Sequence, residues 1–227
     1  MSLNLTKPAE GSVGWAAAIN QNFTDIQDVE AALGEDFSFF RQAGTSPFEC
    51  WYPPSLGPET GAPVTTPPLG SLSVDTLYAF PYFESRGGTL DRIAFKVTTG
   101  GSAGSVARAG IYRATSLTNL YPDSLVADGG QFDTTTTGTK VTNISVALSR
   151  GLYWLAFLCG TAAPTVRSLK RSTPMTILGM TSDLDTVRGA GLQVSQSYGA
   201  LPSTFPSSAT IRGQSDPYLV IAVRYSA

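Results

Sequence analysis

The side chains that most often carry out chemistry in proteins are scarce in this chain. Its 227 residues include no histidine, so the commonest general base and the commonest metal ligand are both missing. The two cysteines, Cys50 and Cys159, lie too far apart in the sequence for a zinc cluster, which needs more ligands at closer spacing. A disulfide would form only if the fold brought them together. We expect two buried thiols, because free cysteine is among the most buried residue types.

Paired carboxylates that hydrolyse a glycosidic bond are a catalytic pattern that acidic residues supply without histidine. The acidic residues considered for it are scattered over expected turns: Glu84, Asp91, Asp123, Asp128, Asp133, Asp183 and Asp185. Their spacing gives no reason to select any two as acid and base. We therefore expect no enzymatic activity, no catalytic residues, no cofactor and no metal site.

A glycine-rich stretch, "TTGGSAGSVARAG" at 98–110, is the one segment that suggests a phosphate-binding loop. Such a loop requires a Gly-Lys-Ser/Thr sequence followed by a helix, and neither is present. We interpret the glycines as a hairpin turn between two strands.

Aromatic side chains indicate a different function, because exposed rings stack on sugar faces while their polar ends form hydrogen bonds. Most of the tyrosines and tryptophans are expected in the core, and Tyr153 and Trp154 lie in the most apolar stretch of the chain. Tyr121 and Tyr198 each lie in a turn flanked by proline or glycine. These two are our candidates for an exposed contact with a glycan.

Composition narrows the function classes further. Hydrophobic residues make up 42% of the chain and charged residues only 14%, below the quarter or so that is usual in globular domains. The net charge of −2 predicts no basic surface for nucleic acid. No stretch is long and apolar enough to span a bilayer, and "MSLNLTKPAEG" has no apolar run of a secretory signal. We therefore expect no membrane insertion and no signal peptide.

One amphipathic helix is expected at residues 12–34, between an N-cap at Ser12 and a left-handed position at Gly34. Its apolar residues recur at steps of three and four: Trp15, Ile19, Phe23, Ile26, Val29 and Leu33. All of these except Phe23 also fit the a and d positions of a heptad, in which Asn22 forms one polar layer. A lone helix of this length is marginal in water. It must pack on its own β-domain or on copies of itself, and we expect a small parallel bundle.

The rest of the chain reads as a connecting segment followed by strands. Residues 45–70 are rich in proline, which forbids a helix and predicts a stiff, extended connection. Strand patterns then recur at 72–83, 89–99, 105–114, 124–134, 140–148, 151–160 and 217–227. The apolar positions of the fifth pattern change phase, which predicts a bulge near Asn143. The sixth is apolar throughout, which predicts a central strand buried on both faces.

Seven or eight strands at this spacing, separated by Gly, Pro, Ser and Asp, predict a mainly β fold. We expect an antiparallel, jelly-roll-like β-sandwich preceded by the single N-terminal helix. The expected organisation is an N-terminal arm and helix at 1–44, a connecting segment at 45–70 and a β-sandwich domain at 71–227.

The N-terminal segment resembles that of many tail-fibre and virion proteins of tailed bacteriophages and prophages. The resemblance rests on a Leu-Thr-Lys-Pro opening, a glycine, a tryptophan and an Ile-Asn-x-Asn-Phe-x-x-Ile run: Leu5, Thr6, Lys7, Pro8, Gly11, Trp15, Ile19, Asn20, Asn22, Phe23 and Ile26. The stretch from "LDRIAFKVTT" at 90–99 to "GLYWLAFLCG" at 151–160 is similar to a β-sandwich module of such proteins, and "YGALPSTFP" at 198–206 fits the same group.

The resemblance implies a homotrimeric fibre or spike protein of the virion, whose N-terminal segment joins other virion proteins. The sandwich would then face the host and contact surface polysaccharide or protein. Three positions fit a short chain: a short tail fibre, a receptor-binding tip, or a fibre on the head. Two alternatives stay open, namely an architectural or decoration protein that binds no receptor, and a free carbohydrate-binding module whose helix folds back on its own sheet.

Overall fold

A computed structural model describes residues 72–84, 87–116, 119–169, 191–212 and 218–226 of the chain. The expected helix at 12–34 and its oligomerisation residues lie outside this part: Trp15, Ile19, Asn22, Phe23, Ile26, Val29 and Leu33. The predicted connecting segment at 45–70, including Cys50, also lies outside it. These expectations, and the domain boundaries drawn from them, stay predictions.

The first six predicted patterns each correspond to one long strand. The pattern predicted as one strand at 217–227 is wrong in part, because it is divided into two strands that pair in different sheets, and the other short strands were not predicted. The long strands are β1 (Thr76–Glu84), β2 (Gly88–Thr99), β3 (Val106–Ala114), β4 (Pro122–Asp133), β5 (Gly138–Leu148) and β6 (Gly151–Gly160). The shorter ones are β7 (Thr165–Val166), β8 (Ser168–Leu169), β9 (Leu192–Ser195), β10 (Thr210–Ile211), β11 (Tyr218–Leu219) and β12 (Ile221–Tyr225). Within this part of the chain there is no helix, and so none that could cross a membrane.

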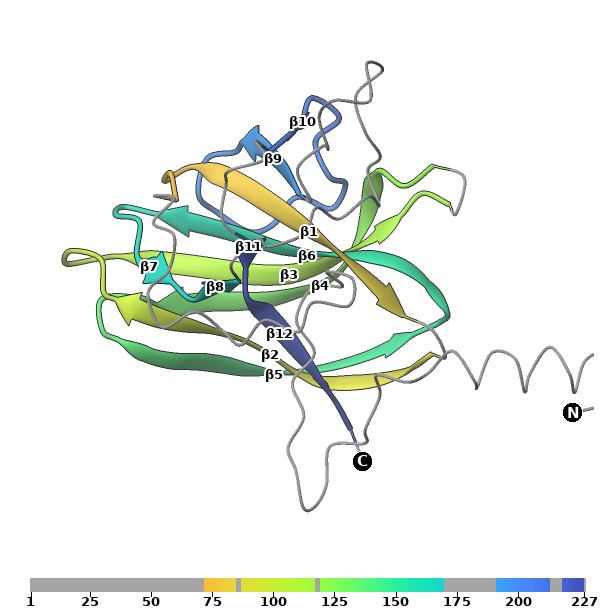
Figure 1. Cartoon of the computed structure of the whole chain (residues 1–227), viewed down its shortest axis with the longest axis horizontal. Coiled ribbons are helices and arrows are strands. Elements are labelled where there is room, and N and C mark those ends of the chain that lie inside the picture. Colours follow the sequence, from red (N-terminus) through yellow and green to blue (C-terminus); the bar gives the residue numbers. More distant parts are fainter. Residues whose placement is uncertain (1–71, 85–86, 117–118, 170–190, 213–217, 227) are drawn as a thin grey trace, which may run out of the picture. The chain divides into compact units, whose positions relative to one another are not determined.

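Two main sheets organise these strands, and every strand pair in them is antiparallel. The larger has the order β10-β9-β1-β6-β3-β4, and the smaller has the order β12-β2-β5 with β7 also paired to β2. The pair β11–β8 stands apart from both. Figure 1 shows β1, β6, β3 and β4 as one layer and β2, β5 and β12 as the other. The predicted mainly antiparallel β class is therefore confirmed.

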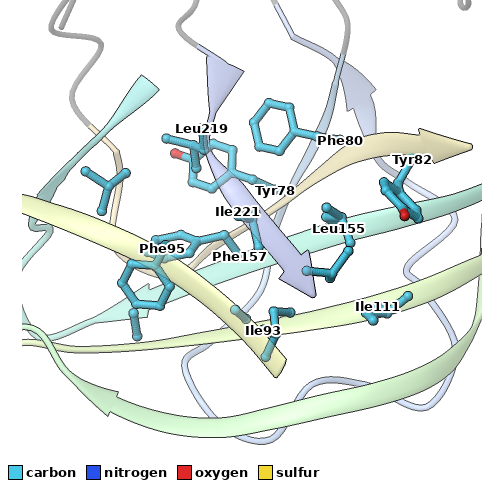
Figure 2. Packing of buried hydrophobic residues seen from close by; sticks show 14 of the residues in the cluster. Tyr78, Phe80, Tyr82, Ile93, Phe95, Ile111, Leu155, Phe157, Leu219 and Ile221 are labelled. Carbon is cyan, nitrogen blue, oxygen red and sulfur yellow. The ribbon is translucent and has the colours of Figure 1, made fainter. Parts of the chain in front are cut away.

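The inward faces of both sheets share one apolar cluster. β2 contributes Ile93 and Phe95, which meet Phe157 of β6 and Ile221 of β12 (Figure 2). The rings of Phe95 and Phe157 have centroids 5.1 Å apart at 88°, and Phe95 meets Phe132 in the same edge-to-face way. This geometry suits the ring quadrupoles and fixes how the layers face each other.

A second apolar cluster covers the other face of the six-stranded sheet. It joins Leu77 of β1, Tyr112 of β3 and Trp154 of β6 to Leu201 and Phe205, which lie between β9 and β10. The sheet is therefore buried on both faces. This explains β6, which is buried at every position from Leu152 to Gly160 and pairs with both β1 and β3. The predicted central, doubly buried strand is confirmed.

Two further strand predictions have clear outcomes. β5 takes three steps from Asn143 to Val146 while β2 takes two from Arg92 to Leu90, so the predicted bulge near Asn143 is confirmed. The predicted hairpin at the glycine-rich stretch is wrong. That stretch connects β2 to β3, which belong to different sheets, so it is a crossing between layers.

Candidate functional site

A single long loop crosses the outer face of the six-stranded sheet. Residues 196–209, here called the strap, leave β9 and return as β10, which pairs with β9 at Thr210 and Ile211. Because its two ends meet in this pair, the strap is a compact loop of the Ω type, a class that is often functional. Several of its exposed positions carry small side chains with hydroxyl groups: Ser197, Ser203, Thr204, Ser207 and Ser208.

Asp75 holds the start of the strap. Its carbonyl oxygen accepts the backbone N–H of Gln196 at 2.9 Å, and its carboxylate accepts that of Tyr198 at 2.7 Å. The backbone N–H of Asp75 in turn donates to the carbonyl of Cys159 at 2.9 Å. Asp75 adopts a left-handed conformation with φ of 54°, which aspartate tolerates better than most residues. One turn before β1 thus ties the strap to the end of β6.

Asp128 holds the middle of the strap. Its Oδ2 accepts the backbone N–H of Leu201 at 3.1 Å and a guanidinium N–H of Arg108 at 2.7 Å, while its Oδ1 accepts the N–H of Gly130 at 2.9 Å. Three chain segments therefore meet at one carboxylate. The Leu201 side chain fits only because position 110 is glycine, since a β-carbon there would lie 2.3 Å from the Leu201 Cδ1 atom.

Arg108, Asp128, Gln131 and Tyr198 form a group of polar side chains at this point, here called the Arg108 cluster. The Tyr198 hydroxyl shares its one proton between two acceptors, Gln131 Oε1 at 3.2 Å and the carbonyl of Ala107 at 3.4 Å, both long distances for such bonds. Burial raises the pKa of Tyr198, and the neighbouring Arg108 guanidinium opposes that rise. Arg108 Nε is buried and has no hydrogen-bond partner among the described residues.

Tyr121 holds the far end of the strap. Its hydroxyl donates to the carbonyl of Pro206 at 2.6 Å and accepts the backbone N–H of Ala209 at 3.1 Å. Its ring meets Phe205 edge-to-face, and Phe205 also meets Tyr112 with centroids 5.1 Å apart. The Tyr112 hydroxyl donates to the carbonyl of Pro202 at 2.8 Å. Each tyrosine here uses its ring for packing and its hydroxyl to hold strap backbone.

The strap also pairs with the outer edge of β4. Leu125 donates its backbone N–H to Ser203 at 2.9 Å, Phe205 donates to Asp123 at 2.7 Å, and Ser124 faces Thr204 in an antiparallel bridge. The pairing of β4 with β3 shifts register at three places, so β4 bends where it meets the strap.

The structure brings both sequence-predicted glycan residues to the same loop. Tyr121 and Tyr198 are each partly buried, and both hydroxyls bind protein atoms of the strap or its supports. Their contact with a glycan stays a prediction. What the sequence did not indicate is the polar group around Tyr198, because Arg108, Asp128 and Gln131 lie far from it along the chain.

The acidic residues considered earlier are spread over the described part of the chain. Glu84 is buried and bonds with Tyr225, Asp91 pairs with Arg224 at 2.9 Å, and Asp133 is exposed beside Thr135. Asp183 and Asp185 lie outside the described residues. Within those residues, no group of three His, Cys, Asp or Glu side chains gathers closely enough to hold a metal ion.

Glu84, Tyr225 and Tyr82 form a second buried polar group, where β1 lies near the C-terminal strand. Tyr225 donates to Glu84, the two tyrosine hydroxyls bond to each other, and Gly87 donates its N–H to Glu84 Oε1 at 2.9 Å. Burial, with the nearby Tyr82 and Glu84, raises the pKa of Tyr225. These bonds attach the last strand to β1, which is a structural task.

No protein-family model matches the chain, and no curated protein sequence matches it.

Proposed function

We propose that this protein is an oligomeric structural component of a bacteriophage virion, a tail fibre, spike or head fibre, which contacts glycan on the host surface. The N-terminal residues support the attachment role, because their pattern resembles that of virion fibre proteins. The localisation that follows is the virion, reached from the cytoplasm of the host. In this proposal the protein is not an enzyme.

The strand order supports a jelly-roll β-sandwich for the outward-facing part. In a jelly roll, two Greek keys wind the chain back and forth between two facing sheets. The connections β1–β2, β2–β3, β4–β5 and β5–β6 each cross between the sheets, while β3 and β4 pair within one. The resulting orders, β1-β6-β3-β4 and β12-β2-β5, are those that this winding produces.

The observation that carries the glycan contact is the convergence of Tyr121 and Tyr198 on one strap. Both residues lie in turns of the sequence, and Tyr198 begins the same hydroxyl-rich loop whose far end Tyr121 binds. Adsorption to host cells by the purified protein is the direct test. Adsorption that competes with virions supports the proposal, whereas an oligomer that is present in virions but binds no cells favours the architectural alternative.

Assembly through the N-terminal helix is tested by the solution mass of the full chain. We expect about three times the 23.9 kDa of one chain by size exclusion with light scattering. The double substitution Ile19→Asp and Ile26→Asp should reduce the solution mass to that of one chain, because burying unpaired carboxylates in the seam costs desolvation free energy. Thr24→Asp, which lies off the seam, is the control. A monomer in every case would favour the free carbohydrate-binding module.

A further inference from the structure

We propose that the Arg108 cluster binds one neutral hexose unit of a glycan, with Gln131 and Tyr198 as the contacting side chains. This rests on the proposed function and specifies its ligand. Four observations support it: the balance of charge in the cluster, the hydrogen-bonding capacity that the protein leaves unused, the fixed placement of the side chains, and the exposure of Gln131.

The charges of the cluster favour a neutral ligand. The Arg108 guanidinium is bonded to the Asp128 carboxylate at 2.7 Å, so the two charges compensate each other. A phosphate or a carboxylate brought to Arg108 would also meet Asp128, which repels it. A sugar hydroxyl has no such conflict, because it donates and accepts.

The unused hydrogen-bonding capacity matches the pattern of sugar hydroxyls. Gln131 is exposed; its Oε1 accepts from Tyr198, and among the described residues its amide N–H groups have no bonding partner. The Tyr198 hydroxyl makes two long bonds, to Gln131 and to the carbonyl of Ala107, and it also interacts with the Arg108 guanidinium. Arg108 Nε is a buried donor without a partner in the part of the chain that the structure describes, so the contacts to the sugar fall to the more exposed Gln131 and Tyr198.

The cluster is held in place before any ligand arrives. Asp128 fixes Arg108 from one side, and Asp75 fixes the backbone of Tyr198 at 2.7 Å. The Tyr198 ring lies directly on the backbone of β6, where a β-carbon on Gly160 would lie 2.5 Å from the Tyr198 Cγ atom. Side chains that are already ordered lose little conformational entropy on binding, so a weak sugar contact gains affinity.

Tyr121 has a different role in this proposal. Its hydroxyl is satisfied twice by the strap, through Pro206 and Ala209. We assign Tyr121 to holding the strap, so that Tyr198 is the one of the two tyrosines that contacts the sugar, together with Gln131. Tyr121 and Tyr198, which share a turn context in the sequence, therefore have different roles in the structure.

The test uses the full chain and a panel of methyl hexopyranosides of glucose, galactose and mannose. Methyl glucuronide and inorganic phosphate serve as anionic comparisons. Saturation-transfer and titration NMR measure which of these bind and how strongly. We expect at least one neutral hexoside to bind and the two anions not to bind.

Substitutions then locate the contact. Gln131→Ala and Tyr198→Phe should each weaken the neutral hexoside about tenfold, the effect of losing one or two hydrogen bonds. Asn143→Ala removes an exposed amide from β5 of the other sheet and should change nothing. Tyr121→Phe should lower stability and leave affinity within about twofold, because the contact does not involve it.

The outcomes separate this proposal from the one it rests on. Binding of anions only, of no hexoside, or of a hexoside equally well by Gln131→Ala overturns the assignment of the site. If the Gln131→Ala protein then still adsorbs to host cells, contact with the host stands and lies elsewhere on the molecule. If the unsubstituted protein neither assembles nor adsorbs, the virion function itself fails.

Discussion

At the scale of single residues, three side chains decide where the strap lies. Asp75, Asp128 and Tyr121 hold its start, middle and end, and each does so by bonding strap backbone N–H groups. Backbone donors that leave a sheet must find acceptors elsewhere, since an unpaired buried N–H costs as much as a lost hydrogen bond. The strap is therefore ordered by long-range hydrogen bonds, which no local pattern in its own sequence predicts.

Gly160→Ala tests how closely Tyr198 lies on β6. The new β-carbon would be 2.5 Å from the tyrosine Cγ, so the ring and the strap start must move. We expect a loss of about 1–3 kcal/mol in the free energy of unfolding, measured in urea, with faster amide exchange in the strap. Gly199→Ala is the matched control, because nothing lies within 4 Å of its β-carbon. Equal effects of the two substitutions would contradict the packing described here.

Cys159 provides a pH-dependent test of burial. Desolvation, with the nearby Asp75 charge, raises the pKa of its thiol from 9.0 to about 12. Below pH 9 the thiol is protonated in both folded and unfolded chains. Between pH 9 and 12 only the unfolded chain loses the proton, so stability falls as the pH rises.

In a Cys50→Ala background under reducing conditions, raising the pH from 8 to 10.5 should lower the unfolding free energy by roughly 1–2 kcal/mol more than in the same protein with Cys159→Ala. The comparison cancels the contributions of the tyrosines, which both proteins share. Identical pH dependence in the two proteins would mean that Cys159 is not desolvated.

At the scale of elements, strands that repeat a simple pattern were predictable and short ones were not. Alternation or continuous apolarity located β1 to β6 and the C-terminal strand, and the phase change in β5 located its bulge. The two-residue strands β7, β8, β10 and β11 have no period that a sequence pattern can register. Which sheet each strand joins depends on contacts far apart in the chain, and this is why the predicted hairpin after β2 was wrong.

The candidate site was predictable only in part, for the same reason. The turn context of Tyr121 and Tyr198 marked both residues, but it could not show that they hold one loop. Leu201 and Phe205 look like ordinary apolar residues in a Ser- and Pro-rich stretch, and only the fold shows them covering the six-stranded sheet.

Leu155→Ala tests the central place of β6. Leu155 is fully buried between the sheets, so its loss removes apolar contacts and leaves a cavity. We expect a destabilisation of about 2–5 kcal/mol by urea unfolding. Val141→Ala on β5 is the comparison, because Val141 is 42% exposed and should cost less than about 1 kcal/mol. A cost for Leu155→Ala no larger than for Val141→Ala would argue against the doubly buried strand.

At the scale of the whole described domain, stability should be highest in the middle of the six-stranded sheet. β6, with β1 and β3 on either side, is bonded along both edges and buried on both faces. The strap is attached by a handful of bonds to an otherwise complete sheet. The domain therefore consists of a rigid centre and a covering loop that opens at lower free energy than the centre unfolds.

Hydrogen exchange measured along the full chain should reproduce this order. We expect β6 amides to exchange only through global unfolding, and the strap amides of Gln196, Tyr198 and Leu201 to exchange through local opening at lower free energy. Tyr121→Phe should speed exchange in the strap, and the β6 amides should remain the slowest to exchange. Uniform exchange across strap and centre would show instead that the two unfold together.

The pairing of residues 203–205 with β4 has a consequence for how the protein behaves in storage and at high concentration. β4 is the last strand of its sheet, and the strap occupies backbone groups that would otherwise be free to pair with a neighbouring molecule. A variant with a loosened strap would lose some stability and would also polymerise slowly through exposed β4 edges. The strap therefore protects the shelf life of the protein as well as its resistance to heat.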